Sequence, residues 1–326
     1  MKSNVPVRSL LVALVLVFLA PLVSAQTATS SSTDVSAASA ATSQTVSFAV
    51  GEGPEAIAFD GTNVWVANQF GGTVLKMRVG DGAILGTYSA GKRPVALVFD
   101  GANVWVANYL SDNVTKLRVR DGLILGTYDT GDGPGGLAFD GKNIWVANRN
   151  SNNVTKLQAS NGLKLGTFAV GTRPLALAFD GANIWVTNNN SDTVTALQAS
   201  DGSVLGTYAV GKGPFGVAFD GANIWVANFF SKTVIELASN GSVVNKVAVG
   251  DGPSGVIFAG GYLWVANNGS NTVSKLEPSA GTVVGTFAVG RGPFGVVFDG
   301  TNIWAASSSA GTVSKISPAN KFSSVP

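Results

Sequence analysis

A motif of about forty residues recurs seven times between Gly51 and Val313, and this repeat constrains the fold more than any other feature of the chain. Its form is close to G-x-x-P-x-x-(I/V/L)-A-F-D-G-x-N-(I/V)-W-V-A-N-x-x-S-x-T-V-x-K-L. The copies contain all seven tryptophans, which are Trp65, Trp105, Trp145, Trp185, Trp225, Trp264 and Trp304. A repeat of this period is typical of solenoids, propellers and arrays.

Each copy contains four short apolar runs separated by turn residues, and these runs predict four β-strands. In the fifth copy they span residues 216–219, 223–228, 233–237 and 243–249. Asp-Gly and Asn-Gly pairs between the runs favour tight hairpins, because both residues tolerate positive φ. The second run is apolar on both faces, as expected for a small sheet packed between two others. A radial stack of four-stranded blades satisfies this pattern.

The two ends of the repeat array predict a closed ring. The last copy supplies only three strands, whereas residues 47–51 match the fourth strands of later copies, such as residues 167–171. An open solenoid usually carries atypical caps instead. We therefore predict an all-β fold: a seven-bladed β-propeller over residues 45–317, with four strands per blade, closed by the N-terminal strand completing the last blade.

The residues before the repeats resemble an export signal. Lys2 and Arg8 precede an apolar run over residues 10–20, and Val23-Ser24-Ala25 supplies a small-residue cleavage pattern. The run is about half as long as the roughly twenty residues of a spanning helix, so we expect a protein that does not span a membrane. The expected segments are a signal peptide (1–25), a flexible Ser/Thr/Ala-rich leader (26–44) and a C-terminal tail (318–326). The protein is expected to be extracellular, periplasmic or attached to the cell surface.

Charge gives no indication of a nucleic-acid partner. The segment 1–25 contains two of the 21 basic residues and none of the 19 acidic ones, so the processed chain is formally neutral. A nucleic-acid footprint would need clustered Lys and Arg, which the sequence lacks. We expect a monomer whose partner is an unknown extracellular ligand or protein.

The repeat resembles the YVTN family of bacterial β-propellers, within the wider group of NHL-like and surface-layer-associated propellers. Residues 267–276, residues 285–290 and Pro293 form the most similar stretch, and the similarity covers roughly residues 45–316. Trp-Val-Ala-Asn stands where the family often has Tyr-Val-Thr-Asn. The resemblance implies the blade architecture and an extracellular or surface protein, but it implies no particular ligand.

Two families of enzymatic propellers, the streptogramin lyase-like proteins and the propeller lactonases, resemble the chain in fold. The lyase-like chemistry relies on a histidine base and a metal, but this chain contains no His and no Cys. It therefore lacks the usual acid–base group near neutral pH, and it cannot form Ser-His-Asp or Cys-His arrangements. Only an all-carboxylate zinc site would remain. We assign no catalytic residue, metal or cofactor, although a carboxylate could replace histidine.

Most of the repeated polar and aromatic residues are expected to serve the scaffold. The aspartates before glycine are expected to bind nearby backbone groups in their turns. They are Asp60, Asp100, Asp140, Asp180, Asp220 and Asp299. Each tryptophan occupies the same place in the second strand, where blades pack together, so we interpret the tryptophans as core. The asparagine that ends the second strand is expected to cap a loop or to link blades.

Positions that vary between blades are the better guide to binding. Strand direction places the fourth-to-first and second-to-third loops on one face, and aromatic and Arg side chains are favoured anchors there. The predicted ligand-binding residues are Phe215, Phe230, Phe294, Lys212, Arg291, Arg93 and Arg173. Alternatively, the phenylalanine rings plug the channel. The carboxylates to test for catalysis on this face are Glu52, Glu55, Asp132 and Asp251.

Three functions are compatible with these patterns. The first is an exported, non-catalytic binding or interaction module whose ligand lies on the variable loop face. The second is a lyase- or lactonase-like enzyme that uses carboxylates at the channel mouth. The third is a structural cell-surface protein. The sequence favours the first of these.

Overall fold

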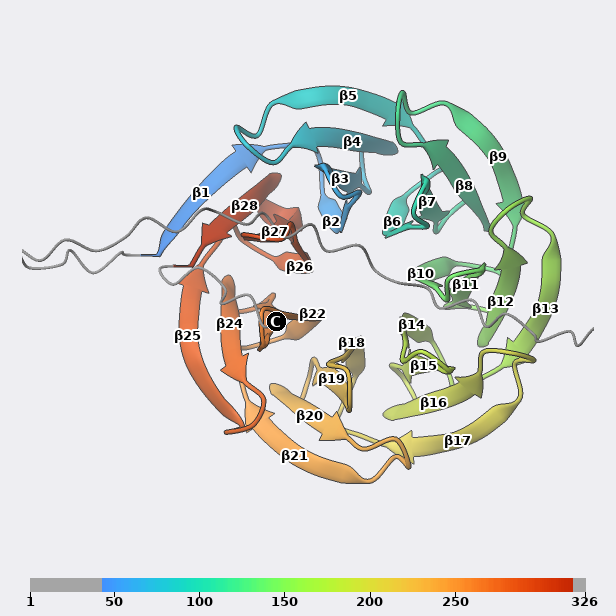
Figure 1. The fold of residues 1–326 in the computed structure, drawn as a ribbon, viewed down its shortest axis with the longest axis vertical. Helices are drawn as coiled ribbons and strands as arrows, with labels where there is room; N and C mark the ends of the chain where they lie inside the picture. The colour runs from blue at the N-terminus through green and yellow to red at the C-terminus, as the bar shows by residue number, and fades with distance from the viewer. Residues whose placement is uncertain (1–42, 319–326) are drawn as a thin grey trace, which may run out of the picture. The chain divides into compact units, whose positions relative to one another are not determined.

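The computed structural model describes residues 43–318 and forms a ring of seven four-stranded antiparallel sheets (Figure 1). This arrangement confirms the predicted seven-bladed β-propeller. The first three blades contain β2 (Pro54–Phe59), β3 (Asn63–Asn68), β4 (Thr73–Arg78), β5 (Ile84–Ser89), β6 (Pro94–Phe99), β7 (Asn103–Asn108), β8 (Asn113–Arg118), β9 (Ile124–Asp129), β10 (Pro134–Phe139), β11 (Asn143–Asn148), β12 (Asn153–Gln158) and β13 (Lys164–Ala169).

The next three blades have the same strand order. They contain β14 (Pro174–Phe179), β15 (Asn183–Asn188), β16 (Thr193–Gln198), β17 (Val204–Ala209), β18 (Pro214–Phe219), β19 (Ile224–Asn228), β20 (Thr233–Leu237), β21 (Val243–Ala248), β22 (Pro253–Ala259), β23 (Tyr262–Asn267), β24 (Thr272–Glu277) and β25 (Thr282–Ala288). The seventh blade contains β26 (Pro293–Phe298), β27 (Ile303–Ser307), β28 (Thr312–Ser317) and β1 (Gln44–Ala49), with a 3-10 turn, η1 (Ser308–Ala310), before β28.

The ring is closed by the first strand of the chain. β1 pairs antiparallel with β28 from Gln44 opposite Ser317 to Ala49 opposite Thr312. The Phe48 ring stacks on Trp304 with 5.8 Å between ring centroids. Closure by the N-terminal strand is therefore confirmed, and the two ends of the repeat array hold each other in one sheet.

The second strand of each blade forms the core because sheets cover it on both sides. Every tryptophan lies in this strand and is at most 1% exposed. In six blades the indole Nε1 donates a hydrogen bond of 2.6–2.7 Å to the turn aspartate five residues earlier. Each of these aspartates also accepts two backbone N–H bonds, as Asp140 does from Lys142 and Asn143. In the sixth blade Ala259 replaces the aspartate, and its carbonyl accepts the Trp264 bond at 3.3 Å.

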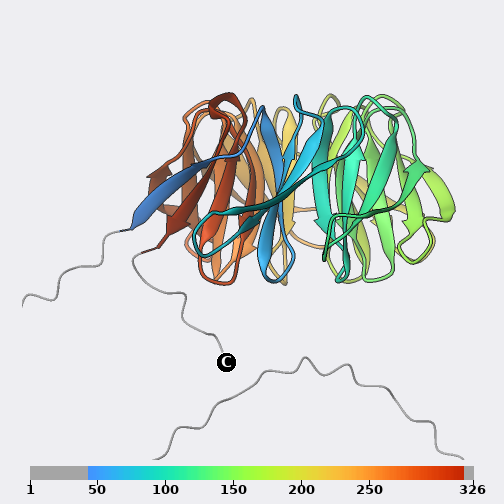
Figure 2. The ribbon, with the colours of Figure 1, turned by 90° about the horizontal axis from the view of Figure 1, so that it is seen from above.

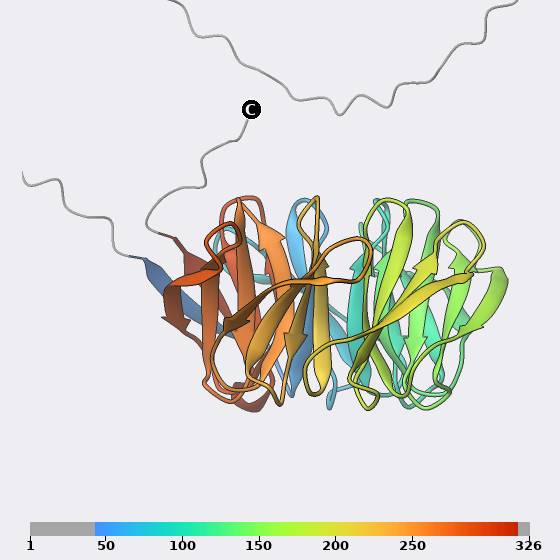
Figure 3. The ribbon, with the colours of Figure 1, turned by 90° about the horizontal axis from the view of Figure 1, so that it is seen from below.

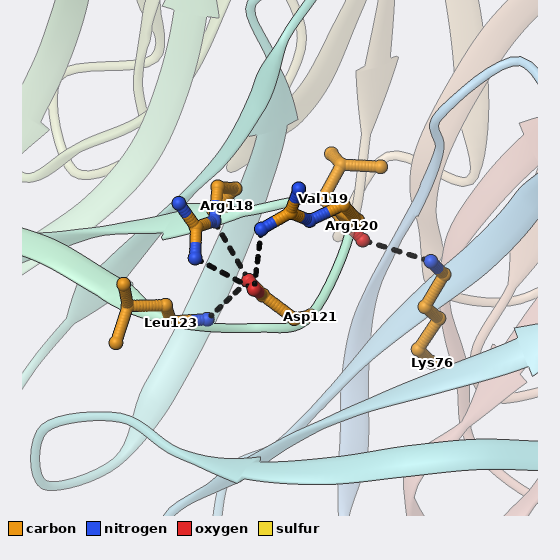
Figure 4. A network of polar contacts seen from close by, with 6 residues as sticks. All are labelled: Lys76, Arg118, Val119, Arg120, Asp121 and Leu123. Atoms are coloured by element: carbon orange, nitrogen blue, oxygen red, sulfur yellow. Dashed lines mark hydrogen bonds and ion pairs between the residues drawn. The ribbon is translucent and has the colours of Figure 1, made fainter.

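Lysines of the third strands join neighbouring blades. Lys76 Nζ donates to the Val119 carbonyl of the next blade at 2.8 Å, beside the turn where Arg118 binds Asp121 (Figure 4). Lys116 and Lys156 make the equivalent bonds farther round the ring, each at 2.7 Å. Lys315 donates to the Val79 carbonyl and so joins the last blade to the first.

The loops lie on two opposite faces of the ring (Figures 2 and 3). Backbone bonds join the fourth-to-first loops to the second-to-third loops, for example from Tyr109 N–H to the Arg93 carbonyl at 2.9 Å. We call this side the loop face, and the side with the Asp-Gly turns the turn face. Within residues 43–318, no helix is long and apolar enough to cross a membrane.

Asp140→Ala tests the tryptophan–aspartate bond. We expect the free energy of unfolding to fall by about 1.5–3 kcal/mol, because a buried indole N–H loses a charged acceptor. Asp201→Ala, in an exposed turn of the same face, should change stability by less than about 0.5 kcal/mol. Urea denaturation measures both, and equal losses would contradict the role of Asp140.

The contribution of Asp140 should also depend on pH. Burial raises the pKa of this carboxyl, but hydrogen bonds from Asn143 and Trp145 outweigh burial and hold the pKa below its usual value of 3.8. A lowered pKa stabilises the fold above the unfolded-state pKa, and this stabilisation is lost as the pH falls through the folded-state pKa. The stability difference between wild type and Asp140→Ala should therefore shrink below about pH 4.

Truncation tests ring closure. A chain that begins at Ser43 should melt with the full chain, whereas one that begins at Gly51 should melt at least about 6 °C lower, because it loses the Phe48 packing and leaves the β28 edge unpaired. Circular dichroism measures both midpoints. Equal midpoints would show that the first strand does not seal the ring.

Candidate functional site

The central channel opens on the loop face as a small cavity of about 170 Å³. Residues that directly follow the prolines of the first strands contribute to its lining. These are Glu55, Val95, Gly135, Leu175, Phe215 and Phe294. In every blade the pairing register between the first and second strands shifts just after this proline. Such bulges change the direction of a side chain, which explains why this one position supplies the variable lining.

An acidic and a basic side chain meet at one side of the cavity. Glu55 Oε1 lies 3.7 Å from Arg149 Nη2, and the two side chains are only 12% and 13% exposed. Arg149 follows β11, and its Nη2 donates to the Gly135 carbonyl at 3.1 Å. A Cβ on Gly135 would collide with the Arg149 side chain. The missing side chain at Gly135 therefore provides the space in which this arginine lies.

Burial controls the ionisation of this pair. Desolvation raises the pKa of Glu55, although the positive charges of Arg149 and Arg93 act against the rise. Desolvation likewise lowers the pKa of Arg149, and Glu55 opposes that change. Arg149 Nε is buried without a hydrogen-bond partner. The site thus contains a carboxyl that protonates more readily than an exposed one, beside a guanidinium with unused donor capacity.

Further cations surround this pair. The guanidinium carbons of Arg93 and Arg149 lie 5.1 and 5.4 Å from the centre of the Tyr109 ring, so the ring lies against both cations. Arg93 Nε also donates to Gln69 Oε1 at 3.2 Å. Arg173 is close enough for its charge to lower the pKa of Arg149. These side chains come from neighbouring blades and gather on one half of the loop face.

Aromatic rings occupy the other half of the channel mouth. The Phe215 ring lies 5.8 Å from Phe294 and 6.1 Å from Phe229, between centroids. Phe230 meets Phe229 edge-on at 5.2 Å and is 70% exposed. It packs over Gly213, whose φ of +62° and close approach leave no room for a side chain. The mouth is therefore charged on one side and aromatic on the other.

The predicted binding residues fall into two groups. Phe215 and Phe294 line the cavity, and Arg93 stands beside its charged side. Phe230, Arg173 and Arg291 are exposed on the same face. Lys212 is also exposed and forms an ion pair of 2.9 Å with Asp192. The structure therefore brings only part of this set together, and whether the set binds a ligand stays a prediction.

Among the four carboxylates proposed for testing, only Glu55 lies in the cavity. Glu52 is exposed, Asp132 accepts a bond from Asn150, and Asp251 pairs with Lys232 at 2.8 Å. Sequence reasoning missed Arg149. Two features of the sequence could have pointed to Arg149. The loop tip Arg149-Asn150 is the only one of the seven tips with a charged first residue, and the residue after the proline of the same blade is glycine, at position 135.

The described part of the chain offers no obvious metal centre. No group of three or more Asp or Glu residues is placed to hold a metal ion within residues 43–318. At the channel mouth a single carboxylate faces several arginines, and cations are poor neighbours for a metal ion. The carboxylate and the arginines at the channel mouth can instead transfer protons and stabilise negative charge.

A larger hollow of about 1220 Å³ lies on the turn face under the second to fourth blades. Two of its three lysines, Lys116 and Lys156, are already bound to carbonyls of the next blade, and the third, Lys142, is exposed. Its aspartates, Asp100 and Asp140, already accept tryptophan N–H bonds. The hollow therefore follows from the repeated scaffold, and its size does not make it the better site.

Comparison with known proteins places the fold among propellers that include enzymes. No family model and no curated protein sequence matches the chain. Virginiamycin B lyase from Staphylococcus aureus superposes with a TM-score of 0.73 at 17% identity, over 85% of this chain and 99% of that one. A streptogramin B lyase gives 0.74 at 17%, over 86% and 98%. Kuenenia stuttgartiensis hydrazine synthase gives 0.74 at 20%, over 82% and 96%.

These neighbours correct one expectation from the sequence. The non-catalytic binding module is contradicted, because the first structures matched are lyases and therefore enzymes. The chain contains no histidine, but a buried carboxyl with a raised pKa is an acid–base group that residue counts do not reveal. At these identities the likeness establishes the fold, and the chemistry has to be argued from the site.

Gly135→Ala tests the packing of Arg149 across the cavity. The new methyl group should displace the guanidinium and cost about 1–3 kcal/mol. Loss of this cation should raise the pKa of Glu55 further. A raised pKa favours the fold at low pH, and that contribution is lost as the pH rises through the folded-state pKa. The destabilisation should therefore be larger at pH 8 than at pH 5.

Gly80→Ala is the matched control, because a Cβ there meets no atom within 4 Å. This variant should unfold like the wild type at both pH values. Urea denaturation at the two pH values measures the comparison. If Gly135→Ala does not lower the free energy of unfolding, or lowers it equally at both pH values, the described environment of Glu55 is contradicted.

Proposed function

We propose that the protein is an enzyme whose active site is the channel mouth on the loop face, with Glu55 as the acid–base group. One observation carries this proposal: Glu55 is nearly buried in a cavity, has a raised pKa and faces Arg149 at 3.7 Å. A carboxyl whose pKa moves toward the working pH is a better proton-transfer group than an exposed one. Perturbed ionisable groups in cavities are typical of active sites.

The reaction class that fits these groups is acid–base catalysis on a carbonyl compound, as in a lyase or a lactonase. In a lyase step, ionised Glu55 takes a proton from the carbon beside the carbonyl, and the released electron pair forms a double bond as the leaving group departs. In a lactonase step, Glu55 takes a proton from water, whose oxygen attacks the carbonyl carbon; the ring C–O bond then breaks, and the leaving oxygen takes the proton from Glu55. Both steps place negative charge on the carbonyl oxygen.

Arg149 is the group that would stabilise this developing charge. A preorganised donor in a water-poor site is most effective where charge appears during the reaction. The space created by Gly135 holds the Arg149 guanidinium beside the cavity, which this residue helps to line. Glu55 and Arg149 would thus act as the base and the electrostatic stabiliser.

The structural neighbours support an enzyme but not the same catalyst. One neighbour is a catalytically inactive His-to-Ala variant of virginiamycin B lyase with quinupristin, with a TM-score of 0.74 at 18% identity, over 85% of this chain and 99% of that one. The chain described here contains no histidine. A carboxylate base is therefore the form that such chemistry would take.

We also propose that the repeats are of the YVTN type and that the chain is exported as a monomer. The repeat motif and the N-terminal pattern of Lys2, Arg8 and Val23-Ser24-Ala25 support these points. Finding Gln26 as the first residue of the mature protein by N-terminal mass spectrometry would support export. An intact Met1 on the secreted form would contradict it.

Glu55→Gln tests the catalytic role. We assay the full chain against aryl esters, aromatic lactones and quinupristin, and follow the products by mass spectrometry. The substitution should lower kcat by about 10²- to 10⁴-fold, because it removes the proton acceptor. The kcat/KM of the wild type should rise with pH through the raised pKa of Glu55, whose charged neighbours are Arg149 and Arg93.

Glu52→Gln is the matched control, since this carboxylate lies on the same face but is exposed. It should leave kcat within about twofold of the wild type, as expected for a surface change. Lack of turnover of the whole panel by the wild type would overturn the proposal. Full activity of Glu55→Gln would overturn the role of Glu55.

A further inference from the structure

The two halves of the channel mouth differ in chemistry, and the difference constrains what can bind there. Arg93 and Arg149 lie against Tyr109 on one side, while Phe215 and Phe294 lie against each other on the other side. A ligand in a cavity of about 170 Å³ would touch both halves. Such a ligand therefore has to match the charged half and the apolar half of the cavity at the same time.

The charged half has more positive than negative charge. The charges of Arg93 and Arg173 both act on Arg149, and the carboxylate that pairs with Arg149 in the described contacts is Glu55. Arginine suits this role, because its planar guanidinium donates two parallel hydrogen bonds to a carboxylate. The uncompensated positive charge on this side of the cavity calls for an anionic group.

The aromatic half offers a stacking surface. Phe215 and Phe294 are partly buried and contribute to the cavity lining together with Leu175 and Val95. Offset or tilted contacts with a further ring add stabilisation beyond the burial of apolar area. These side chains favour an aromatic or similarly flat apolar group over a polar one.

We infer that the substrates of this site are small aromatic acids or their close derivatives, with the anionic group held by Arg149 and Arg93 and the ring held by Phe215 and Phe294. Since a water molecule takes up about 30 Å³ in the liquid, the cavity admits one ring with a short acidic arm, while any larger remainder stays outside. This inference rests on the proposed function, because it names the substrate class of the same site.

Binding of three small probes tests the inference on the full chain by isothermal titration calorimetry. Phenylacetate carries both features, acetate carries only the charge, and phenylacetamide carries only the ring. Phenylacetate should bind at least about tenfold more tightly than either of the others, since each feature adds its own contact. Phenylacetamide binding as tightly as phenylacetate would overturn the charge assignment, and acetate binding as tightly would overturn the aromatic assignment.

Variants test the two halves separately. Arg149→Met and Phe215→Ala should each weaken phenylacetate binding by about tenfold or more. Lys142→Met, on the opposite turn face, should leave it unchanged. Thermal melts verify that each variant is folded. If a folded Arg149→Met binds phenylacetate as well as the wild type, the anion site is contradicted.

Glu55→Gln distinguishes this inference from the proposed catalysis. Loss of the carboxylate removes a negative charge beside the anion site, so phenylacetate should bind at least as tightly as in the wild type, even though turnover is lost. Phenylacetate binding without turnover of any panel substrate would overturn the catalytic proposal and leave the anion site standing. Turnover of a neutral aliphatic lactone added to the panel, without turnover of any aromatic member, would overturn the substrate class and leave catalysis standing.

Discussion

The burial of one tryptophan per blade is the constraint on which the rest of the ring depends. The second strand is covered by neighbouring sheets on both sides, so its indole N–H cannot reach water. A buried donor without a partner would cost about 1–3 kcal/mol, and the aspartate at the preceding turn removes this penalty. The same aspartate holds the turn through backbone N–H bonds. A single pair of residues thus connects the core of each blade with its turn face.

A second set of repeated contacts joins each blade to the next around the ring. Lysines of third strands donate to carbonyls of the next blade, and aromatic rings of fourth strands pack on glycines there, as Tyr128 does on Gly162. The last such contacts, from Lys315 to Val79 and from Phe48 to Gly82, join the seventh blade to the first. Because these contacts recur from blade to blade, almost every repeated feature of the motif serves the scaffold. Binding and catalysis therefore depend on positions whose residue differs from blade to blade.

The channel mouth uses such positions. The bulge after each proline frees one residue per blade, and at this position one blade supplies Glu55, another a phenylalanine, and another the glycine that admits Arg149. The low-dielectric surroundings raise the pKa of Glu55 and make the neighbouring cations more effective than they would be in water. Catalysis and anion binding would thus depend on the same burial.

The sequence by itself determined the seven blades, the closure by the first strand and the two faces of the ring, because these features follow from a strict repeat of turns and apolar runs. It also placed Glu55, Phe215 and Phe294 on the face that contains the cavity. Only the tertiary structure brought Arg149 to Glu55, and it did so through the missing side chain of Gly135. It also placed Lys212 in an ion pair on the surface. Periodicity encodes contacts that recur in every blade, whereas this site is assembled from different blades by side chains whose positions are decided by local packing.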